Sequence, residues 1–374
     1  MRLLATKCVA VWRDRRFRSL CRGFLRTATE ETDVLVGPNW AFRGGVRNHI
    51  LALKRYSALR LALLPHDALT LKLCEQDRIG EFKSWFGTVD LNRFRAIHTH
   101  VDPWLITSCA NCRPKRFAWV HTYHTLYFDQ HYRLGLSDDH RAVNDALLNL
   151  ARQADERICV SRWLQEHLDR QYGIATRYIP NGVDIAACDG ADARRFQAAH
   201  RIDDVVLFTG GCQEIKGPLD CLRLAARLPD VRFAMAGEGM TIESIRDMTG
   251  AEPPRNVVLL GELSRADTLD AVAACSVFVM TSKTEGLPTA LLEAMALRKP
   301  VVAPDLDGCL EAIGSEECGF IYRHDSLDDL VEKTRAALVD TTRGAKARER
   351  VLREYDWRVV APRLDDVYRA LACR

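Results

Sequence analysis

Two carboxylates, Glu285 and Glu293, stand with seven residues between them around the start of a predicted helix. The first lies in a polar loop, residues 281–286, and the second lies two turns into the helix. Carboxylates in such places can accept hydrogen bonds from hydroxyl groups. Free backbone N–H groups at the helix start favour an anionic ligand. A nucleotide sugar carries both phosphate groups and a sugar rich in hydroxyl groups. This stretch therefore predicts a binding site for that class of ligand.

The elements around the two carboxylates form a β–loop–α–β unit. An apolar run at residues 277–280 predicts a strand that is buried on both faces. The helix has Pro288 in its first turn, where the missing N–H costs nothing, and it stops before Pro300. Val301 and Val302 begin the next strand. The loop is therefore expected at the carboxyl end of a parallel strand, where open α/β sheets bind ligands.

The surrounding string, EGLPTALLEAMALRKPVVA, resembles the E-x7-E signature of retaining glycosyltransferases of family 4, and the resemblance extends over about residues 33–374. It implies an α/β chain with the GT-B fold, in which two Rossmann-like, doubly wound domains face a cleft. It also implies retaining transfer of a sugar from a nucleotide sugar to a hydroxyl acceptor, either a glycan or a lipid-linked glycan. The family works without a cofactor or a bound metal.

By this resemblance, Glu285 would hold hydroxyl groups of the transferred sugar and Glu293 would hold the nucleotide ribose. The donor-binding residues of the motif are then Glu285, Gly286, Leu287, Pro288 and Glu293. The start of the helix would stabilise the departing diphosphate. No dedicated nucleophile is identified, because the usual family mechanism is front-face attack, in which the leaving phosphate helps to deprotonate the acceptor.

A second motif, TGGCQEIKGPL, follows a predicted strand at residues 205–208. The family has a Gly-Arg pair and then a Lys-Gly pair here, and both cations face the donor diphosphate. This chain keeps Lys216 before a glycine, which predicts a catalytic and donor-binding lysine, but it has Gly211 where the family arginine would be. The missing charge-assisted contact is worth roughly 1.5–3 kcal/mol. Arg43 and Arg47 are candidate substitutes.

Paired glycines, Gly44 and Gly45, follow the first predicted strand, residues 33–36, and precede a helix. Glycines at such a place let backbone N–H groups approach a phosphate closely. The family has a similar pair near the donor diphosphate. We therefore predict that both glycines bind the donor.

Three histidines, His121, His124 and His131, follow a predicted strand at residues 117–120. A metal site is not predicted, because no carboxylate or cysteine stands at ligand spacing on a helix. The family carries a histidine near the reacting sugar at this point, and the pattern T-aromatic-H-T matches it to His124. The alternatives are His121 in that role, or an ordinary hydrogen-bonded loop histidine.

Length and alternating strand and helix signals predict two domains in these 374 residues. We expect an N-terminal acceptor domain at residues 33–183 and a C-terminal donor domain at residues 184–356. The string IPNGVD at the boundary resembles the family's crossing between domains. Residues 357–374 form an amphipathic helix that, in the family, returns to complete the first domain.

The composition is that of a globular protein, with 47% hydrophobic and 28% charged residues. Thirteen scattered cysteines form no regular framework, which predicts reduced thiols and a cytoplasmic location. No apolar run approaches the roughly 18 residues that span a bilayer. The net charge is only +3, and no nucleic-acid partner is predicted.

Residues 1–32 form a basic N-terminal extension with eight basic and three acidic residues, a net charge of +5. Apolar residues recur at helical spacing in residues 9–28 with arginines between them. Such an amphipathic helix can lie on an anionic membrane, which would make the protein peripheral at the inner face. The alternatives are a helix docked on its own domain or a mis-assigned start, because family enzymes usually begin at their first strand.

The sequence thus favours a glycosyltransferase. Because Gly211 replaces a family cation, one alternative is a catalytically weak homologue that acts as a partner or scaffold subunit. Another alternative is a sugar phosphorylase or a nucleotide-sugar epimerase on the same fold. The sequence leaves open the donor sugar, the base and the acceptor.

Overall fold

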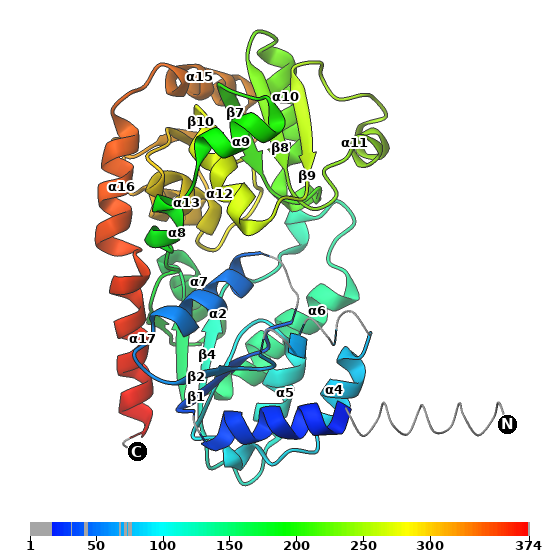
Figure 1. The fold of residues 1–374 in the computed structure, drawn as a ribbon, viewed down its shortest axis with the longest axis vertical. Helices are drawn as coiled ribbons and strands as arrows, with labels where there is room; N and C mark the ends of the chain where they lie inside the picture. The colour runs from blue at the N-terminus through cyan, green and yellow to red at the C-terminus, as the bar shows by residue number, and fades with distance from the viewer. Residues whose placement is uncertain are drawn as a thin grey trace, which may run out of the picture.

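The computed structural model describes residues 17–30, 32–40, 44–66, 69–70, 73 and 77–372. Within these residues the strands form two parallel six-stranded sheets, one in each half of the chain, with helices around both (Figure 1). Doubly wound sheets of this kind are the predicted fold class. No helix of the described residues is both long enough and apolar enough to span a bilayer.

The first sheet has the order β2-β1-β3-β4-β5-β6. Its strands are β1 Val34–Gly37, β2 Leu61–Leu63, β3 Ala96–Thr99, β4 Ala118–Tyr123, β5 Glu156–Cys159 and β6 Arg177–Tyr178. The named helices between and after these strands are α2 Gly45–Tyr56, α4 Ile79–Phe86, α5 Pro103–Asn111, α6 Asp138–Asp145 and α7 Arg162–Tyr172. Short 3-10 or π-helical turns are η1 Leu91–Arg93, η2 Asp129–His131, η3 Ala146–Leu150 and η4 Ala151–Gln153.

The second sheet has the order β12-β11-β10-β7-β8-β9. Its strands are β7 Val205–Thr209, β8 Arg232–Ala236, β9 Val257–Gly261, β10 Val277–Val279, β11 Val301–Pro304 and β12 Phe320–Tyr322. The helices are α8 Ile185–Asp189, α9 Ala193–His200, α10 Pro218–Arg227, α11 Ile242–Thr249, α12 Arg265–Ala274, α13 Thr289–Ala296, α14 Asp307–Ile313, α15 Leu327–Leu338, α16 Arg343–Glu354 and α17 Trp357–Ala372, with a 3-10 turn, η5 Glu214–Lys216. Strand β10 lies between β11 and β7, so Phe278 pairs with both Val301 and Leu207.

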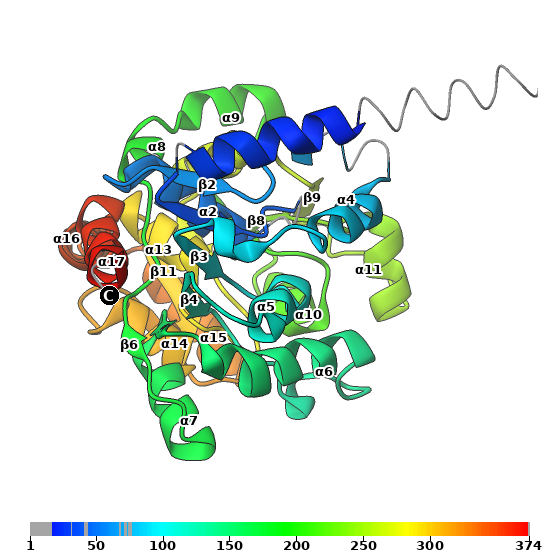
Figure 2. The same cartoon turned by 90° about the horizontal axis from the view of Figure 1, so that it is seen from below.

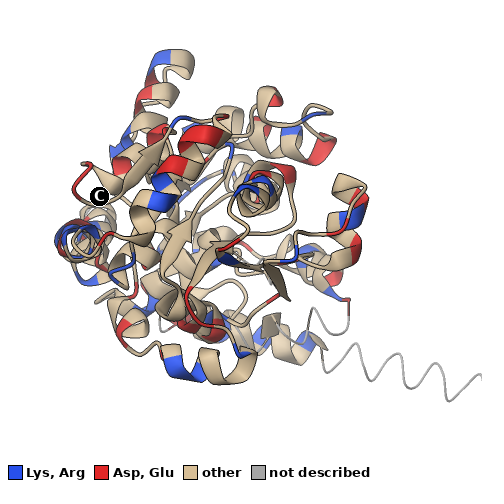
Figure 3. Ribbon diagram, turned by 90° about the horizontal axis from the view of Figure 1, so that it is seen from above, with Lys and Arg blue, Asp and Glu red and all other residues tan. Residues whose placement is uncertain are grey.

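Alternate residues of each strand enter the apolar layers on opposite faces of its sheet. In β1, Leu35 packs in one cluster while Val34 and Val36 pack in the other. Helix α17 contributes Trp357 to the second of these clusters and lies along one side of the molecule (Figures 1 and 2). Viewed from above, charged segments lie mainly on outer helices and loops, and the central strands carry few of them (Figure 3). The predicted domain boundaries stay predictions.

The N-terminal helix, residues 17–30 of the described chain, is docked on the first domain. Phe17, Cys21, Phe24 and Ala28 are buried within one of that domain's apolar clusters. The apolar face of this helix is therefore occupied by its own domain and is not available for insertion into a bilayer. The alternative of a docked helix is confirmed for these residues, and residues 1–16 lie outside the described chain.

Two local predictions need correction. Strand β4 continues to Tyr123, so His121 and Tyr123 are buried strand residues and not part of a loop. Pro288 is the N-cap of α13 and the helix begins at Thr289, because the backbone of Pro288 is still extended. Neither change moves Glu285 or Glu293 away from the carboxyl end of β10.

Candidate active site

The two motif carboxylates lie where β10 leads into α13. Glu285 is in the connecting loop, and Glu293 is a buried residue of the helix. Because β10 is an interior strand of the sheet, the loops after β7 and β11 flank this position. The second domain therefore gathers three loops around the motif.

Lys216 and Glu285 form an ion pair at the end of β7 and β10. Lys216 Nζ lies 2.7 Å from Glu285 Oε1, and Ser282 Oγ donates to the same oxygen at 2.8 Å. The neighbouring carboxylate raises the pKa of Lys216 above its usual value, so the lysine stays protonated. The sequence prediction thus named two residues that the structure brings together.

Gly217 explains how the lysine loop approaches so closely. It has a φ of +67°, and a side chain there would overlap the carbonyl of Thr281. Thr281 Oγ1 in turn donates to Gly217 O at 2.7 Å. The glycine therefore locks the loop of Lys216 against the loop of Glu285.

Glu293 is held by Arg265, a residue that sequence reasoning missed. Arg265 Nη1 lies 2.7 Å from Glu293 Oε2, and Nη2 lies 2.5 Å from Oε1. The Glu293 side chain is 8% exposed, whereas Arg265 is 39% exposed. Its position in the sequence could have identified it, because Arg265 lies four residues after β9, in the first turn of α12. The carboxyl ends of parallel strands share one edge of the sheet, so this turn is expected near the motif.

Three helix starts near the site lack a side-chain cap. The N-cap residues of α2, α10 and α13 are Gly44, Gly217 and Pro288, and none makes a side-chain capping bond. A side chain at Gly45 would lie 3.3 Å from Thr289 Oγ1, so the starts of α2 and α13 face each other across the domains. Backbone N–H groups at such ends favour an anion.

The structure describes one of the two candidate substitute cations. Arg47 lies in the first turn of α2, while Arg43 lies outside the described residues. At Gly211 an added Cβ would meet its nearest neighbours, Gln213 and Glu238, at an ordinary contact distance of 3.6 Å. Steric constraint therefore does not explain the glycine.

His124 follows β4 and lies against the motif loop. A side chain at Gly286 would overlap the carbonyl of His124, so the glycine permits this close approach between the domains. His124 Nε2 lies 2.9 Å from His100 Nδ1. His121, the alternative, is instead bonded to Thr99 within the first sheet, and His131 lies in η2.

A hydrogen-bond chain joins the histidines to the loop that carries Glu285 and Leu287. His49 Nδ1 lies 3.1 Å from Asn181 Oδ1, and Asn181 Nδ2 donates to Leu287 O at 2.9 Å. Because Asn181 uses its oxygen as acceptor, His49 carries its proton on Nδ1. The ring of His49 also packs edge-on against that of His124, with centroids 4.8 Å apart. His49, His100 and Asn181 were missed by sequence reasoning as site residues.

Burial keeps this histidine cluster uncharged. It lowers the pKa of His49 to about 4 and holds those of His100 and His124 well below the usual value. All three rings are therefore neutral at physiological pH. His124 can act as a hydrogen-bonding group beside a sugar, and it is not a cationic acid.

The same three histidines are the residues that could hold a metal ion. Their ligand atoms all lie within 4.8 Å of one another. Tetrahedral zinc with bonds of about 2.0–2.1 Å would place the nitrogens about 3.4 Å apart. His49 Nε2 is buried without a hydrogen-bond partner among the described residues, but His100 Nδ1 and His124 Nε2 lie only 2.9 Å apart and are hydrogen-bonded to each other. The cluster as arranged therefore does not fit zinc.

Comparison with known proteins gives two matching family models. "Glycosyl transferases group 1" matches residues 192–354, and "Glycosyltransferase Family 4" matches residues 76–187. The phosphatidyl-myo-inositol mannosyltransferase of Mycolicibacterium smegmatis is 31% identical over 230 residues, which cover 58% of this chain and 57% of that protein. The chain thus spans little more than half the length of this curated relative.

Solved structures resemble nearly the whole chain. The sucrose-phosphate synthase of Thermosynechococcus elongatus has a TM-score of 0.68 at 21% identity, covering 91% of this chain and 98% of that one. The HepE protein of Anabaena, in complex with UDP and glucose, has a TM-score of 0.72 at 19% identity, covering 90% and 99%. The fold is GT-B, as predicted.

Proposed function

The chain belongs to the group 1 glycosyl transferases of family 4, and we propose that it transfers a sugar from a nucleotide sugar to a hydroxyl group of a lipid-linked acceptor. One observation carries the proposal. The Lys216–Glu285 pair, with 2.7 Å between Nζ and Oε1, lies in the loops that precede the uncapped starts of α10 and α13. This arrangement suits a diphosphate with a hydroxyl-rich sugar beside it.

In the proposed complex, Lys216 and the starts of α2, α10 and α13 hold the diphosphate. Glu285 accepts hydrogen bonds from hydroxyl groups of the sugar, and Glu293 accepts them from the ribose. Arg265 fixes the orientation of Glu293 through both carboxylate oxygens. Because the helix starts and the Arg265–Glu293 pair are in place before the donor arrives, these groups need little reorganisation when charge develops on the leaving group.

The transfer step proposed for this site retains the configuration at the anomeric carbon. The acceptor oxygen attacks that carbon as its bond to the diphosphate breaks, on the same face. The acceptor proton passes to the departing phosphate oxygen. Neutral His124 stands beside the motif loop as a hydrogen-bonding group for the sugar. No metal takes part in this proposed step.

The lipid-linked acceptor is proposed from two relatives. One is named a phosphatidyl-myo-inositol mannosyltransferase, and another, from Campylobacter jejuni, transfers N-acetylgalactosamine to a diphospho-undecaprenol carrier by its name. Both names contain a lipid, phosphatidyl-myo-inositol in one and diphospho-undecaprenol in the other. We therefore place this protein in the cytoplasm, peripheral at the inner face of a membrane.

A second candidate function rests on Gly211. A chain that lacks one of the family's two diphosphate cations could bind a donor weakly and serve as a partner subunit. The structure offers room at this position but puts no described arginine there. Donor binding without turnover would favour this second candidate.

Thermal shift with a panel of nucleotide sugars tests the proposal first, and UDP-glucose and GDP-mannose belong in it. The nucleotide sugar that stabilises the protein is then supplied with phosphatidylinositol or a polyprenyl-phosphate sugar in the presence of EDTA. We expect a glycolipid product with the α or β configuration of the donor. A strict requirement for magnesium or manganese would contradict this mechanism, and transfer to free phosphate would identify a phosphorylase.

A further inference from the structure

His100 and His124 face each other at the edge of the first sheet, where the neighbouring strands β3 and β4 end. His100 Nδ1 lies 2.9 Å from His124 Nε2, and the two side chains are only 1% and 7% exposed. Burial lowers the pKa of both rings, so both are neutral. Each neutral ring carries one N–H proton, so one of the two nitrogens donates and the other accepts. Which nitrogen donates decides what His124 can offer to a ligand.

The other nitrogen of His100 distinguishes the two arrangements. His100 Nε2 is buried and has no hydrogen-bond partner among the described residues. If His124 donated, His100 would carry its proton on Nε2, and a buried N–H group would stay unpaired, which is rare in folded proteins. If His100 donates, Nε2 is a bare lone pair and every N–H group of the pair is used. The second arrangement is therefore favoured.

His49 supports the same assignment. Its proton is on Nδ1, where Asn181 accepts it, so its Nε2 is also a bare acceptor. That atom is likewise buried without a partner in the described part of the chain, although the ring centroids of His49 and His100 lie only 5.5 Å apart. An N–H group on His100 Nε2 would have an acceptor in the neighbouring ring, whereas two lone pairs cannot bond to each other. The unbonded contact between these rings is thus the result expected when His100 donates from Nδ1.

A second histidine supports His100 from the side of the sheet. The ring of His98, in β3, lies 4.4 Å from that of His100 with a tilt of 34°. Both nitrogens of His98 are occupied, Nδ1 by Tyr368 Oη at 2.6 Å and Nε2 by Thr122 Oγ1 at 2.7 Å. Tyr368 belongs to α17, so the C-terminal helix takes part in this support. His100 therefore packs against a ring that is itself held in one orientation.

We propose that His100 is a positioning residue, which donates from Nδ1 to His124 Nε2 and keeps the proton of His124 on Nδ1. His124 then presents an N–H donor, and not a lone pair, to a hydroxyl oxygen of the transferred sugar. Ionised Glu285 can only accept, so the two side chains together offer the sugar one donor and one acceptor. This role of His100 rests on the proposed function, which puts His124 beside the sugar.

The first test locates the protons in the protein without substrate. Nitrogen-15 NMR of the full chain, labelled in histidine, distinguishes protonated from bare ring nitrogens, and His124→Gln identifies the signals of His124. Wild type should show His124 protonated on Nδ1 and bare on Nε2, and protonation on Nε2 would overturn the proposal. In His100→Leu the proton should no longer be confined to Nδ1. An unchanged pattern in this variant would mean that His100 does not fix the proton.

Kinetics separate positioning from packing. With the nucleotide sugar that thermal shift identifies, His100→Leu should lower kcat roughly tenfold, the size of one hydrogen bond, while the KM for the donor changes less than about threefold. His100→Asn, whose amide can replace Nδ1 as the donor, should stay within about threefold of wild type. Equal losses in the two variants would mean that the ring of His100 only fills space, and would overturn the proposal.

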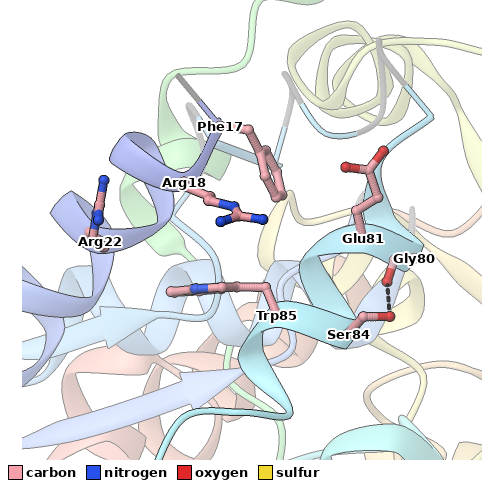
Figure 4. Close-up of a pocket in the computed structure, with 7 residues that line it drawn as sticks. All are labelled: Phe17, Arg18, Arg22, Gly80, Glu81, Ser84 and Trp85. Carbon is pink, nitrogen blue, oxygen red and sulfur yellow. Dashed lines mark hydrogen bonds between the residues drawn. The ribbon is translucent and has the colours of Figure 1, made fainter. Parts of the chain in front are cut away.

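A double variant and two controls complete the test. In a His124→Ala background, His100→Leu should lower kcat no further, because His100 acts through His124. His121→Asn is the matched control, since His121 is equally buried but is bonded to Thr99, and it should keep the wild-type kcat. Ser84→Ala removes an exposed hydrogen bond beside the cavity that the N-terminal helix and α4 line, and it should also behave like wild type (Figure 4). A loss in His121→Asn as large as in His100→Leu would contradict a specific role for His100.

The two experiments fail independently. If no nucleotide sugar is turned over, the proposed function fails, while the NMR spectra still decide how His100 and His124 share their proton. If transfer occurs but His124 is protonated on Nε2, the proposed function stands and His100 is not the residue that fixes the donor.

Discussion

The two motif carboxylates are both paired with a cation, but in different ways. Glu285 pairs with a lysine through one oxygen only: Lys216 Nζ and Ser282 Oγ both donate to its Oε1. Glu293 meets an arginine fork that uses both of its oxygens. A lysine pair exchanges partners easily, whereas a bidentate arginine pair fixes orientation. We therefore expect Glu285 to change partners during the reaction and Glu293 to stay in place.

This difference predicts that the largest effect comes from Glu285. Glu285→Gln should lower turnover by more than about tenfold, because it removes the charge beside Lys216 and the acceptor of sugar hydroxyl bonds. Binding of the nucleoside diphosphate should persist, since the helix starts and Lys216 remain. Steady-state kinetics and calorimetry measure the two quantities. The exposed Glu316→Gln is the control, and wild-type turnover in Glu285→Gln would refute the assignment.

A gain of function should follow from restoring the missing cation. Gly211→Arg should tighten binding of the nucleoside diphosphate by about tenfold or more, the size of one charge-assisted contact. The position tolerates a Cβ at ordinary contact distance. Calorimetric titration of wild type and variant gives the ratio. An unchanged affinity would mean that another cation already occupies this place.

The Arg265–Glu293 pair should affect binding more than turnover. Arg265→Ala should raise the KM for the donor about five- to tenfold while kcat changes less than about threefold, because Glu293 loses its fixed orientation. Glu293→Ala should do the same. The double variant should raise the KM no more than either single variant does, since each substitution already breaks the same Arg265–Glu293 pair. Independent, additive losses would contradict the interpretation of Arg265 as a positioning residue.

The sequence predicted the strand, loop and helix around Glu285 well, because the signals for these elements are local. The strand, the polar loop and the helix of the motif lie within 30 residues, and Lys216 was found through its own short motif. Sequence reasoning missed Arg265 and His100, because each contacts a partner 24 to 28 residues away in the chain and only tertiary packing brings the two together. The N-terminal helix was correctly expected to be amphipathic. Its pattern could not say whether a bilayer or its own domain covers the apolar face, because both are apolar.

The histidine cluster is the uncharged counterpart of the two ion pairs, and it sets the smallest predicted effect. Burial lowers the pKa of His49 to about 4, while an unfolded histidine has an ordinary value near 6.5. The folded state thus favours the neutral ring. This contribution to stability is fully present above pH 6.5 and is lost as the pH falls from 6.5 towards 4. Carboxylates with lowered pKa values, such as Asp33, lose their contribution only at lower pH.

Thermal unfolding measured between pH 8 and pH 4 tests this account. The unfolding temperature of wild type should stay level above pH 7 and fall below pH 6.5. In His49→Asn the fall between pH 6.5 and pH 4 should be smaller, whatever the variant's stability at pH 8, because one group that takes up a proton on unfolding is gone. His200→Asn, on the surface helix α9, is the control and should follow wild type. An equal fall in His49→Asn and wild type would mean that His49 is already protonated in the folded protein. His124 would then pack against a charged ring, and the contrast between a neutral histidine cluster and two ion pairs would not hold.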